Sequence, residues 1–74
     1  MHVALDDGRT LTLARNGHDA YGQARWTGEA RRPFGPEPGA PAIVTDVAVT
    51  GPVYGTDDDA ARIAARALGA EVAR

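Results

Sequence analysis

The stretch GTDDDAARIAARALG, from Gly55 to Gly69, carries the strongest secondary-structure signal in the chain. Thr56 is a favoured helix N-cap, and Asp59, three residues later, can complete a capping box. Apolar residues then recur at helical spacing, and they are Ala60, Ile63, Ala64, Ala67 and Leu68. The pattern predicts a helix near residues 57–68 that buries this stripe and ends at Gly69 in a left-handed conformation.

Three consecutive carboxylates, Asp57–Asp59, open this helix and raise the question of a metal or acid–base site. Side chains of consecutive helical residues diverge, whereas the ligands of one ion must converge. Negative charge near a helix N-terminus is favourable by ~0.3–1 kcal/mol per residue, which explains these residues without a ligand. The two histidines, His2 and His18, have no second histidine at i+3 or i+4, and the chain has no cysteine to complete a zinc site. We therefore predict no metal site and no cofactor.

Before the helix, the segment AIVTDVAVT at residues 42–50 alternates as a strand does. It is the most β-branched segment of the chain, which favours a central strand. The preceding residues, about 29–41, hold four of the five prolines and predict a Pro/Gly-rich surface loop. A long loop of this kind is often functional.

The N-terminal segment, residues 1–15, predicts a β-hairpin. A three-residue loop at Asp6–Gly8 with Gly8 left-handed places Val3 opposite Leu11. This register puts the larger apolar residues of both strands on one face. Asn16-Gly17 predicts a second turn, followed by a third strand near 19–27 whose small residues would let a helix approach closely.

These elements predict a single small domain, residues 1–74, of the α+β class. We expect a small antiparallel sheet of three to four strands, near residues 2–6, 9–15, 19–27 and 42–50, with one C-terminal helix packed on one face. Of the apolar residues, 15 are alanine, so the core should be thin and the monomer marginally stable. A homodimer would bury more apolar surface, either at an exposed sheet edge, at a patch around Tyr21, Trp26 and Tyr54, or by pairing of strand 42–50 across a two-fold axis.

The composition argues against an enzyme. The chain has no serine and no cysteine to act as a nucleophile, and no glycine-rich nucleotide motif. So small a core can hardly spare a pocket of ~300 Å³.

The net charge of −2 disfavours strong electrostatic binding to nucleic acid. The lack of a long apolar run or signal peptide predicts a cytoplasmic protein without a membrane partner. All eight basic residues are arginine, which indicates a GC-rich genome such as that of an actinobacterium or its phage.

One segment, YGQARWTGEARRPFG at residues 21–35, suggests a binding role. It combines aromatic rings with guanidinium groups, which are over-represented at protein interfaces. The candidate partner-binding residues are Tyr21, Arg25, Trp26, Arg31, Arg32 and Phe34. The same residues could instead bind nucleic acid through phosphates and stacked bases, or Trp26 and Phe34 could simply seal the sheet.

The spacing in this segment resembles the small N-terminal DNA-binding domains of phage-type integrases, over about 15 residues and the helix. The resemblance implies three strands, a helix and DNA contact. The chain departs from that pattern by a proline-rich insertion with a further strand, and by the absence of lysine. The favoured hypothesis is a non-enzymatic protein-binding module or accessory protein, such as a phage or mobile-element inhibitor of a host protein; the alternative is a small nucleic-acid-binding domain using residues 21–35.

Overall fold

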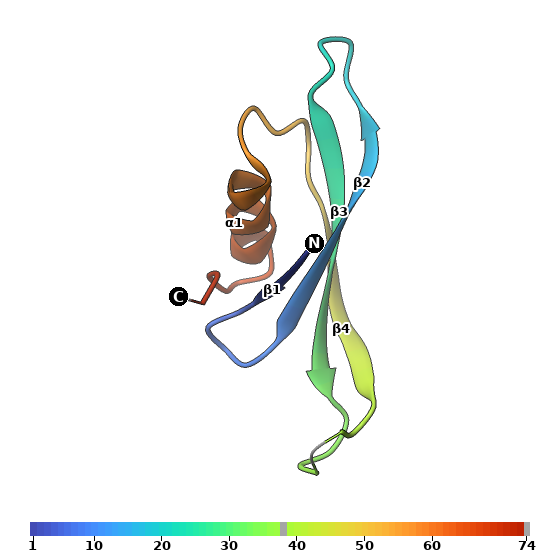
Figure 1. Ribbon diagram of the computed structural model, residues 1–74, viewed down its shortest axis with the longest axis vertical. Helices are drawn as coiled ribbons and strands as arrows, with labels where there is room; N and C mark the ends of the chain where they lie inside the picture. Colours follow the sequence, from blue (N-terminus) through green and yellow to red (C-terminus); the bar gives the residue numbers. More distant parts are fainter. Residues whose placement is uncertain (38, 74) are drawn as a thin grey trace.

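The chain forms an antiparallel four-stranded sheet with one helix on one face, the α+β architecture that the sequence predicts (Figure 1). The computed structural model describes residues 1–37 and 39–73. The strands lie in sequence order in the sheet. The elements are β1 (His2–Ala4), β2 (Thr10–His18), β3 (Ala24–Pro33), β4 (Ala42–Val49) and α1 (Asp57–Ala67).

The hairpin of β1 and β2 has the predicted register. Val3 lies opposite Leu11, and the backbone N–H of Leu5 donates to the carbonyl of Arg9 at 2.8 Å. Gly8 has a φ of 89°, the left-handed conformation that the three-residue loop requires. Leu5, Leu11 and Leu13 consequently share the face that α1 covers, and they form the larger part of the aliphatic core.

The predicted turn at Asn16-Gly17 is wrong, because β2 continues to His18 and the chain turns after Asp19. The carboxylate of Asp19 accepts hydrogen bonds from the backbone N–H groups of Tyr21 and Gln23, at 2.9 and 2.8 Å, and so builds the turn. The ladder register shifts between Arg15 and His18, so the Asn-Gly pair lies in an irregular part of β2. The third strand therefore spans residues 24–33, not 19–27.

This shift changes which small residues lie beside the helix. Leu11 faces Ala30 and Leu13 faces Gly28 in the ladder. An added Cβ at Gly28 would lie 3.1 Å from Leu11, 3.2 Å from Leu13 and 3.4 Å from the Cβ of Ala64. The expected strip of small residues exists, but Gly28 and Ala30 form it.

The helix begins as predicted, with a capping box between Thr56 and Asp59, and Gly69 follows its last turn with a φ of 75°. Its buried face differs from the predicted stripe, because the buried residues are Ala60, Ala61, Ala64 and Ala65. Ile63 is 47% exposed and Ala67 is exposed. The close approach to the strip at Gly28 leaves room for methyl groups only, so the isoleucine lies outside the interface.

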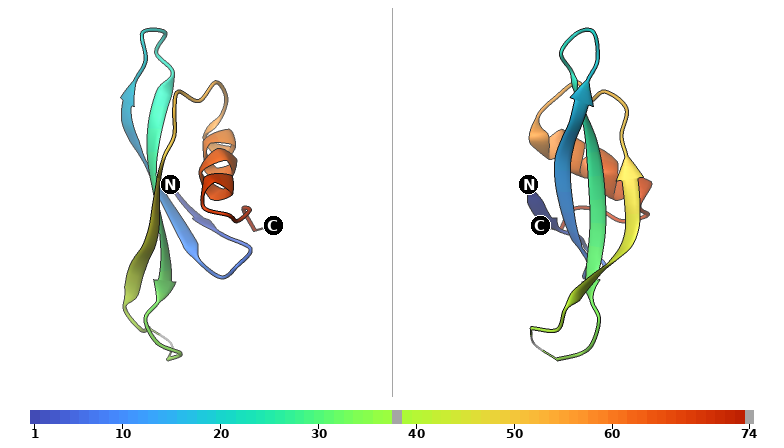
Figure 2. Two further views of the ribbon diagram at one scale, coloured as in Figure 1. Left: turned by 180° about the vertical axis from the view of Figure 1, so that it is seen from behind. Right: turned by 90° about the vertical axis from the view of Figure 1, so that its right-hand side faces the viewer.

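The strand at residues 42–49 lies at the edge of the sheet, which contradicts the prediction that it is central. The central strands are β2 and β3, and Val47 of β4 is 57% exposed. The predicted loop at 29–41 is also shorter, because β3 extends to Pro33. The paired ends of β3 and β4 project beyond the part of the sheet that the helix covers (Figure 2).

The residues after the helix return to the sheet. Val72 forms an isolated antiparallel bridge with Leu5, and the N–H of Asp6 donates to the carbonyl of Glu71 at 2.9 Å. Residues 70–73 therefore contribute one bridge next to β1 but no further strand, and residue 74 lies outside the described part.

The close approach at Gly28 generates a stability prediction. Gly28→Val adds three carbon atoms where a Cβ alone would already contact two leucines and the helix. We expect a loss of about 1–3 kcal/mol in the free energy of unfolding, measured by urea denaturation, because overpacking forces the helix away from the sheet. Gly35→Val is the matched control, since an added Cβ there meets nothing within 4 Å. Equal losses in the two variants would contradict this account of the interface.

Candidate binding surface

A buried arginine holds the sheet and the helix together. Arg9 is 7% exposed, and its side chain donates from Nε to Asp7 at 2.8 Å and from Nη1 to Asp46 of β4 at 2.9 Å. Its Nη2 donates to the carbonyl of Leu68 at 3.0 Å, at the end of α1 where helical carbonyls lack intrahelical partners. We call this group the Arg9 clamp. It links β4, and therefore the projecting part of the sheet, to the end of the helix.

The clamp also shifts the titration of its first partner. Hydrogen bonds from the side chain and the backbone N–H of Arg9 lower the pKa of Asp7, because they stabilise the charged carboxylate. The pKa of Asp59 is lowered chiefly by the backbone N–H of Thr56 and by the side chain of Arg62. Both carboxylates therefore have structural roles, Asp7 as a partner of Arg9 and Asp59 in the capping box of the helix.

The six residues singled out from the sequence do not form one surface. Trp26 is buried under the helix, and the guanidinium of Arg15 lies over its ring at 5.4 Å. Tyr21 is 84% exposed in the turn between β2 and β3, while Phe34 is 74% exposed just beyond the other end of β3. Since β3 is ten residues long, its two ends lie roughly 30 Å apart, and the two rings lie beyond opposite ends.

Three of the six, Arg31, Arg32 and Phe34, lie on the projecting part of the sheet. We call residues 31–44 the distal ribbon; it comprises the ends of β3 and β4 and the described part of the loop between them. Arg32 faces Ile43 and Arg31 faces Val44 in the ladder, so each face of the distal ribbon carries a guanidinium beside a β-branched residue. None of these side chains belongs to the hydrophobic core. Ile43 and Val44 were not among the predicted binding residues, because the β-branched alternation of this segment favoured a central strand.

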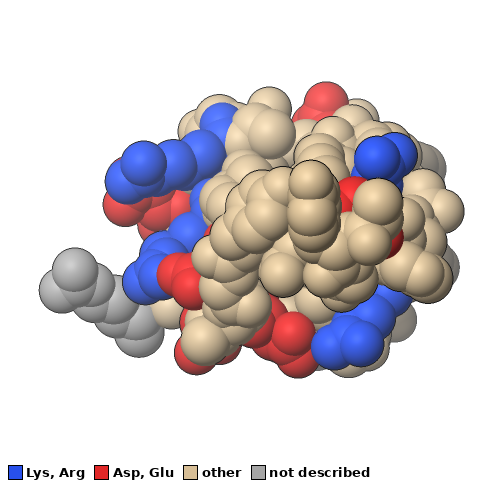
Figure 3. Space-filling model, turned by 90° about the horizontal axis from the view of Figure 1, so that it is seen from above, with Lys and Arg blue, Asp and Glu red and all other residues tan. Residues whose placement is uncertain are grey.

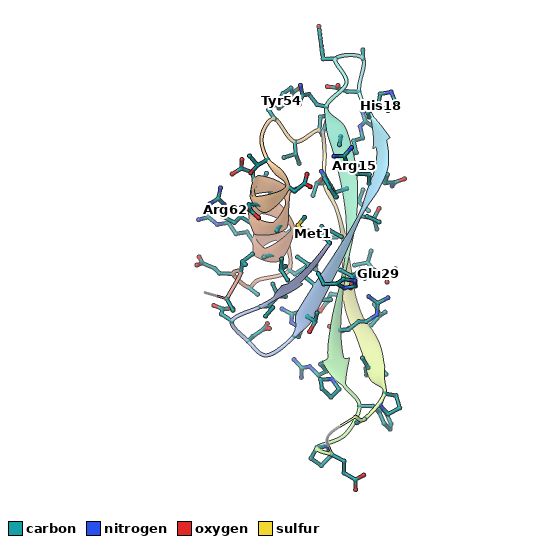
Figure 4. All side chains as sticks on the ribbon, in the orientation of Figure 1. Met1, Arg15, His18, Glu29, Tyr54 and Arg62 are labelled. Carbon is teal, nitrogen blue, oxygen red and sulfur yellow. The ribbon has the colours of Figure 1, made fainter. Side chains whose placement is uncertain are left out.

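The face of the sheet away from the helix, which we call the open face, continues from the ribbon. Its residues include Thr10, Thr12, Thr27, Glu29, Val47 and Val49. Glu29 lies on the side of the sheet opposite α1 (Figure 4), where it forms an ion pair with Arg31. The valines of β4 form the apolar margin of this otherwise polar face.

The opposite end of the molecule has a different character. Seen from the β2–β3 turn, uncharged residues occupy the middle of the surface and charged side chains lie around its rim (Figure 3). Asp19 also accepts a hydrogen bond from the hydroxyl of Tyr54 at 3.3 Å. Its pKa is lowered, chiefly by the N–H of Gln23, so a negative charge persists at this end.

Two shallow hollows flank the helix. One, of about 330 Å³, lies between α1 and the C-terminal residues and is lined by Val3, Asp58, Ala61, Arg62, Arg66, Glu71, Val72 and Ala73. Its volume is comparable to that of the ~300 Å³ pocket that we expected so small a protein to lack, but the hollow lies on the surface and not within the core.

Among residues 1–37 and 39–73, no three His, Cys, Asp or Glu side chains gather to hold a metal ion. No helix in the same residues is long and apolar enough to cross a membrane.

Comparison with known proteins identifies no relative: no family model, no curated protein and no solved structure matches the chain.

The Arg9 clamp generates a second stability prediction. Arg9→Met removes the partner of Asp46 and of the Leu68 carbonyl, so we expect a clearly lower urea midpoint at neutral pH. Arg66→Met, on the exposed face of the same helix, should leave the midpoint nearly unchanged.

The pH dependence of stability distinguishes the contribution of the ion pairs from that of packing by the aliphatic part of the Arg9 side chain. A lowered pKa means that the contribution of Asp7 is present above its unfolded pKa of about 3.9 and is lost as the pH falls through the folded value. The difference between wild type and Arg9→Met should therefore shrink as the pH is lowered from neutral to below about 3.9. A difference that stays the same over this range would contradict a role for the charged pair of Asp7 and Arg9.

Proposed function

We propose that this chain is a non-enzymatic protein-binding module, and that the distal ribbon is its principal contact surface. The observation that carries the proposal is the exposure of apolar side chains on a ribbon that contributes nothing to the core. Phe34, Ile43 and Val44 are all exposed, and they lie within one short segment of the chain. A small domain with few large apolar residues gains no stability from them at this position.

The chemistry of the ribbon fits a protein partner. Arginine and aromatic residues are enriched among the residues that dominate interface energetics, and Arg32 and Phe34 are two residues apart. A projecting two-stranded ribbon can enter a groove of the partner while the helix-covered body stays outside. Regulation of the partner by occupying such a groove would suit an accessory protein or inhibitor that has no catalytic machinery of its own.

The test uses a photocrosslinking amino acid at position 34 and, as a control, at position 21. Both sites carry exposed aromatic rings, at opposite ends of β3, so a general tendency of aromatic residues to crosslink is matched. In cells of the native host, we expect one protein to be captured from position 34 and not from position 21. Adding Arg32→Ala should reduce that capture at least about tenfold, as for an interface hot spot.

Equal capture from both positions, or capture that is indifferent to Arg32→Ala, would contradict the proposal. Circular dichroism of each variant distinguishes loss of binding from loss of folding, since Arg32 and Phe34 lie outside the core.

Nucleic-acid binding is the second candidate function. The observation that favours it is that Arg25 and Arg32 are exposed, and no ion pair joins either of them to an acidic residue in the described part of the chain. A two-stranded ribbon has dimensions that suit the major groove of DNA. The net charge of −2 and the Glu29–Arg31 pair favour the protein partner instead.

This candidate predicts binding of labelled DNA or RNA that weakens steeply with salt. Arg32→Ala should reduce the slope of log K against log salt by about 1, whereas Arg66→Ala on the helix should not. The absence of binding in fluorescence anisotropy at low salt would rule this function out.

A further inference from the structure

The outer edge of β4 has no partner strand among the described residues, and the hydrogen-bonding pattern shows which groups face outward. The N–H of Thr50 donates to the carbonyl of Trp26 at 2.9 Å, so this pair belongs to the hydrogen-bonded class of the β3–β4 ladder. In an antiparallel ladder the classes alternate, and Ala48, opposite Gly28, therefore also bonds inward. The backbone N–H and C=O groups of Val47 and Val49 consequently point away from the sheet.

This edge lacks most of the features that keep natural sheet edges apart. Lysine, arginine and proline are absent from the strand Ala42–Val49. Its one charge, Asp46, lies on the helix side and is paired with the buried Arg9. The register shift between Ala30 and Arg31 interrupts the ladder on one side, so the regular part of the edge is confined to residues 46–50. Ala48 is the midpoint of that segment.

We propose that a second copy of this chain pairs with this edge antiparallel to it, across a two-fold axis at Ala48, and extends the sheet to eight strands. In this register Val47 lies opposite the partner's Val49, and the same contact repeats on the other side of the axis. Both valines are on the open face, so they form an apolar cross-strand cluster. Asp46 lies opposite the partner's Thr50, and no two like charges oppose one another.

The helix layer adds an exposed isoleucine, Ile63, to the proposed contact. Asp58 and Ala61 line a hollow with Val3 and Val72, so this flank of α1 faces β1. Ile63 lies on the other flank, where it lines a hollow with Val53 and Tyr54, which follow β4, and with the charged residues Asp59, Arg62 and Arg66. Ala67 is one turn further on the same flank. The C-terminal end of the helix reaches the side of β4 (Figure 2, right), so the flank exposed there would approach its two-fold mate.

The small residues at this end of the helix permit such an approach. Ala67 and Gly69 are both exposed, and neither has a side chain that would hold two helices apart. The exposure of Ile63, which contributes little to the monomer core, is then explained by burial in the dimer. The inference concerns the edge of β4 and the helix flank, and it does not rest on the proposed function of the distal ribbon.

The decisive experiment introduces a single cysteine into a chain that has none. Ala48 would face its own symmetry mate in a non-hydrogen-bonded pair, whose Cα atoms are ~4.5 Å apart and within the range of a disulfide. Ala48→Cys should therefore form a covalent dimer on mild oxidation. Val49→Cys is the control, because it would lie diagonally from its own mate at ~7–8 Å. Non-specific oxidation would favour the control, since Val49 is exposed and Ala48 is buried.

A second pair of variants keeps the test independent of how cysteine is tolerated. A chain with Val47→Glu and Val49→Glu, and another with Val47→Lys and Val49→Lys, each bring like charges together in the proposed register. Each alone should dimerise at least about tenfold more weakly than the wild type, and a 1:1 mixture should restore the dimer. Light scattering against the monomer mass of 7.7 kDa measures this, and circular dichroism reports folding.

A wild type that stays monomeric at millimolar concentration would overturn the inference. So would crosslinking of Val49→Cys in preference to Ala48→Cys, or failure of the two folded charge variants to associate when mixed. None of these results affects the photocrosslinking experiment at position 34, so the failure of either proposal can be recognised separately.

Discussion

The guanidinium of Arg9 joins three parts of the chain that are far apart in sequence. It bonds to the turn after β1, to β4 and to the last turn of α1. In larger domains, many leucine and phenylalanine contacts hold a helix in place; here the buried residues of the helix are four alanines, whose methyl groups interlock with the sheet less than larger side chains would. A directional group with several acceptors in fixed positions supplies what such a core lacks. Removal of any one acceptor would leave part of a buried charge unpaired, so the three parts depend on one another.

The second constraint is the short distance between helix and sheet. Gly28 and Ala30 on β3 and the alanines of α1 leave no space for larger side chains. The large apolar residues that do not fit there lie at the periphery: Ile63 on the helix flank, the valines on β4, and Phe34 beyond β3. The thin core and the exposed apolar surface are therefore two results of the same close packing.

The candidate site illustrates what can be inferred from residue types alone. The sequence drew attention to a segment rich in arginine and aromatic residues, but it could not show that a ten-residue strand separates Tyr21 from Phe34. Trp26 is buried because it has the same strand parity as Gly28 and Ala30, and this face meets the helix. The sequence favoured a central position for the strand at residues 42–50, since β-branched alternation is the same in a central strand and in an edge strand.

The sequence by itself determined the features that depend on neighbouring residues. The capping box at Thr56, the left-handed Gly8 and Gly69, and the register of the first hairpin all follow from interactions within a few positions, so local patterns reveal them. Only the tertiary structure decided which strand lies at the edge, which side of the helix is buried, and what Arg9 binds. Those outcomes depend on contacts such as Arg9 with Asp46 and with Leu68, 37 and 59 residues apart, and a short sequence pattern carries no information about partners so distant.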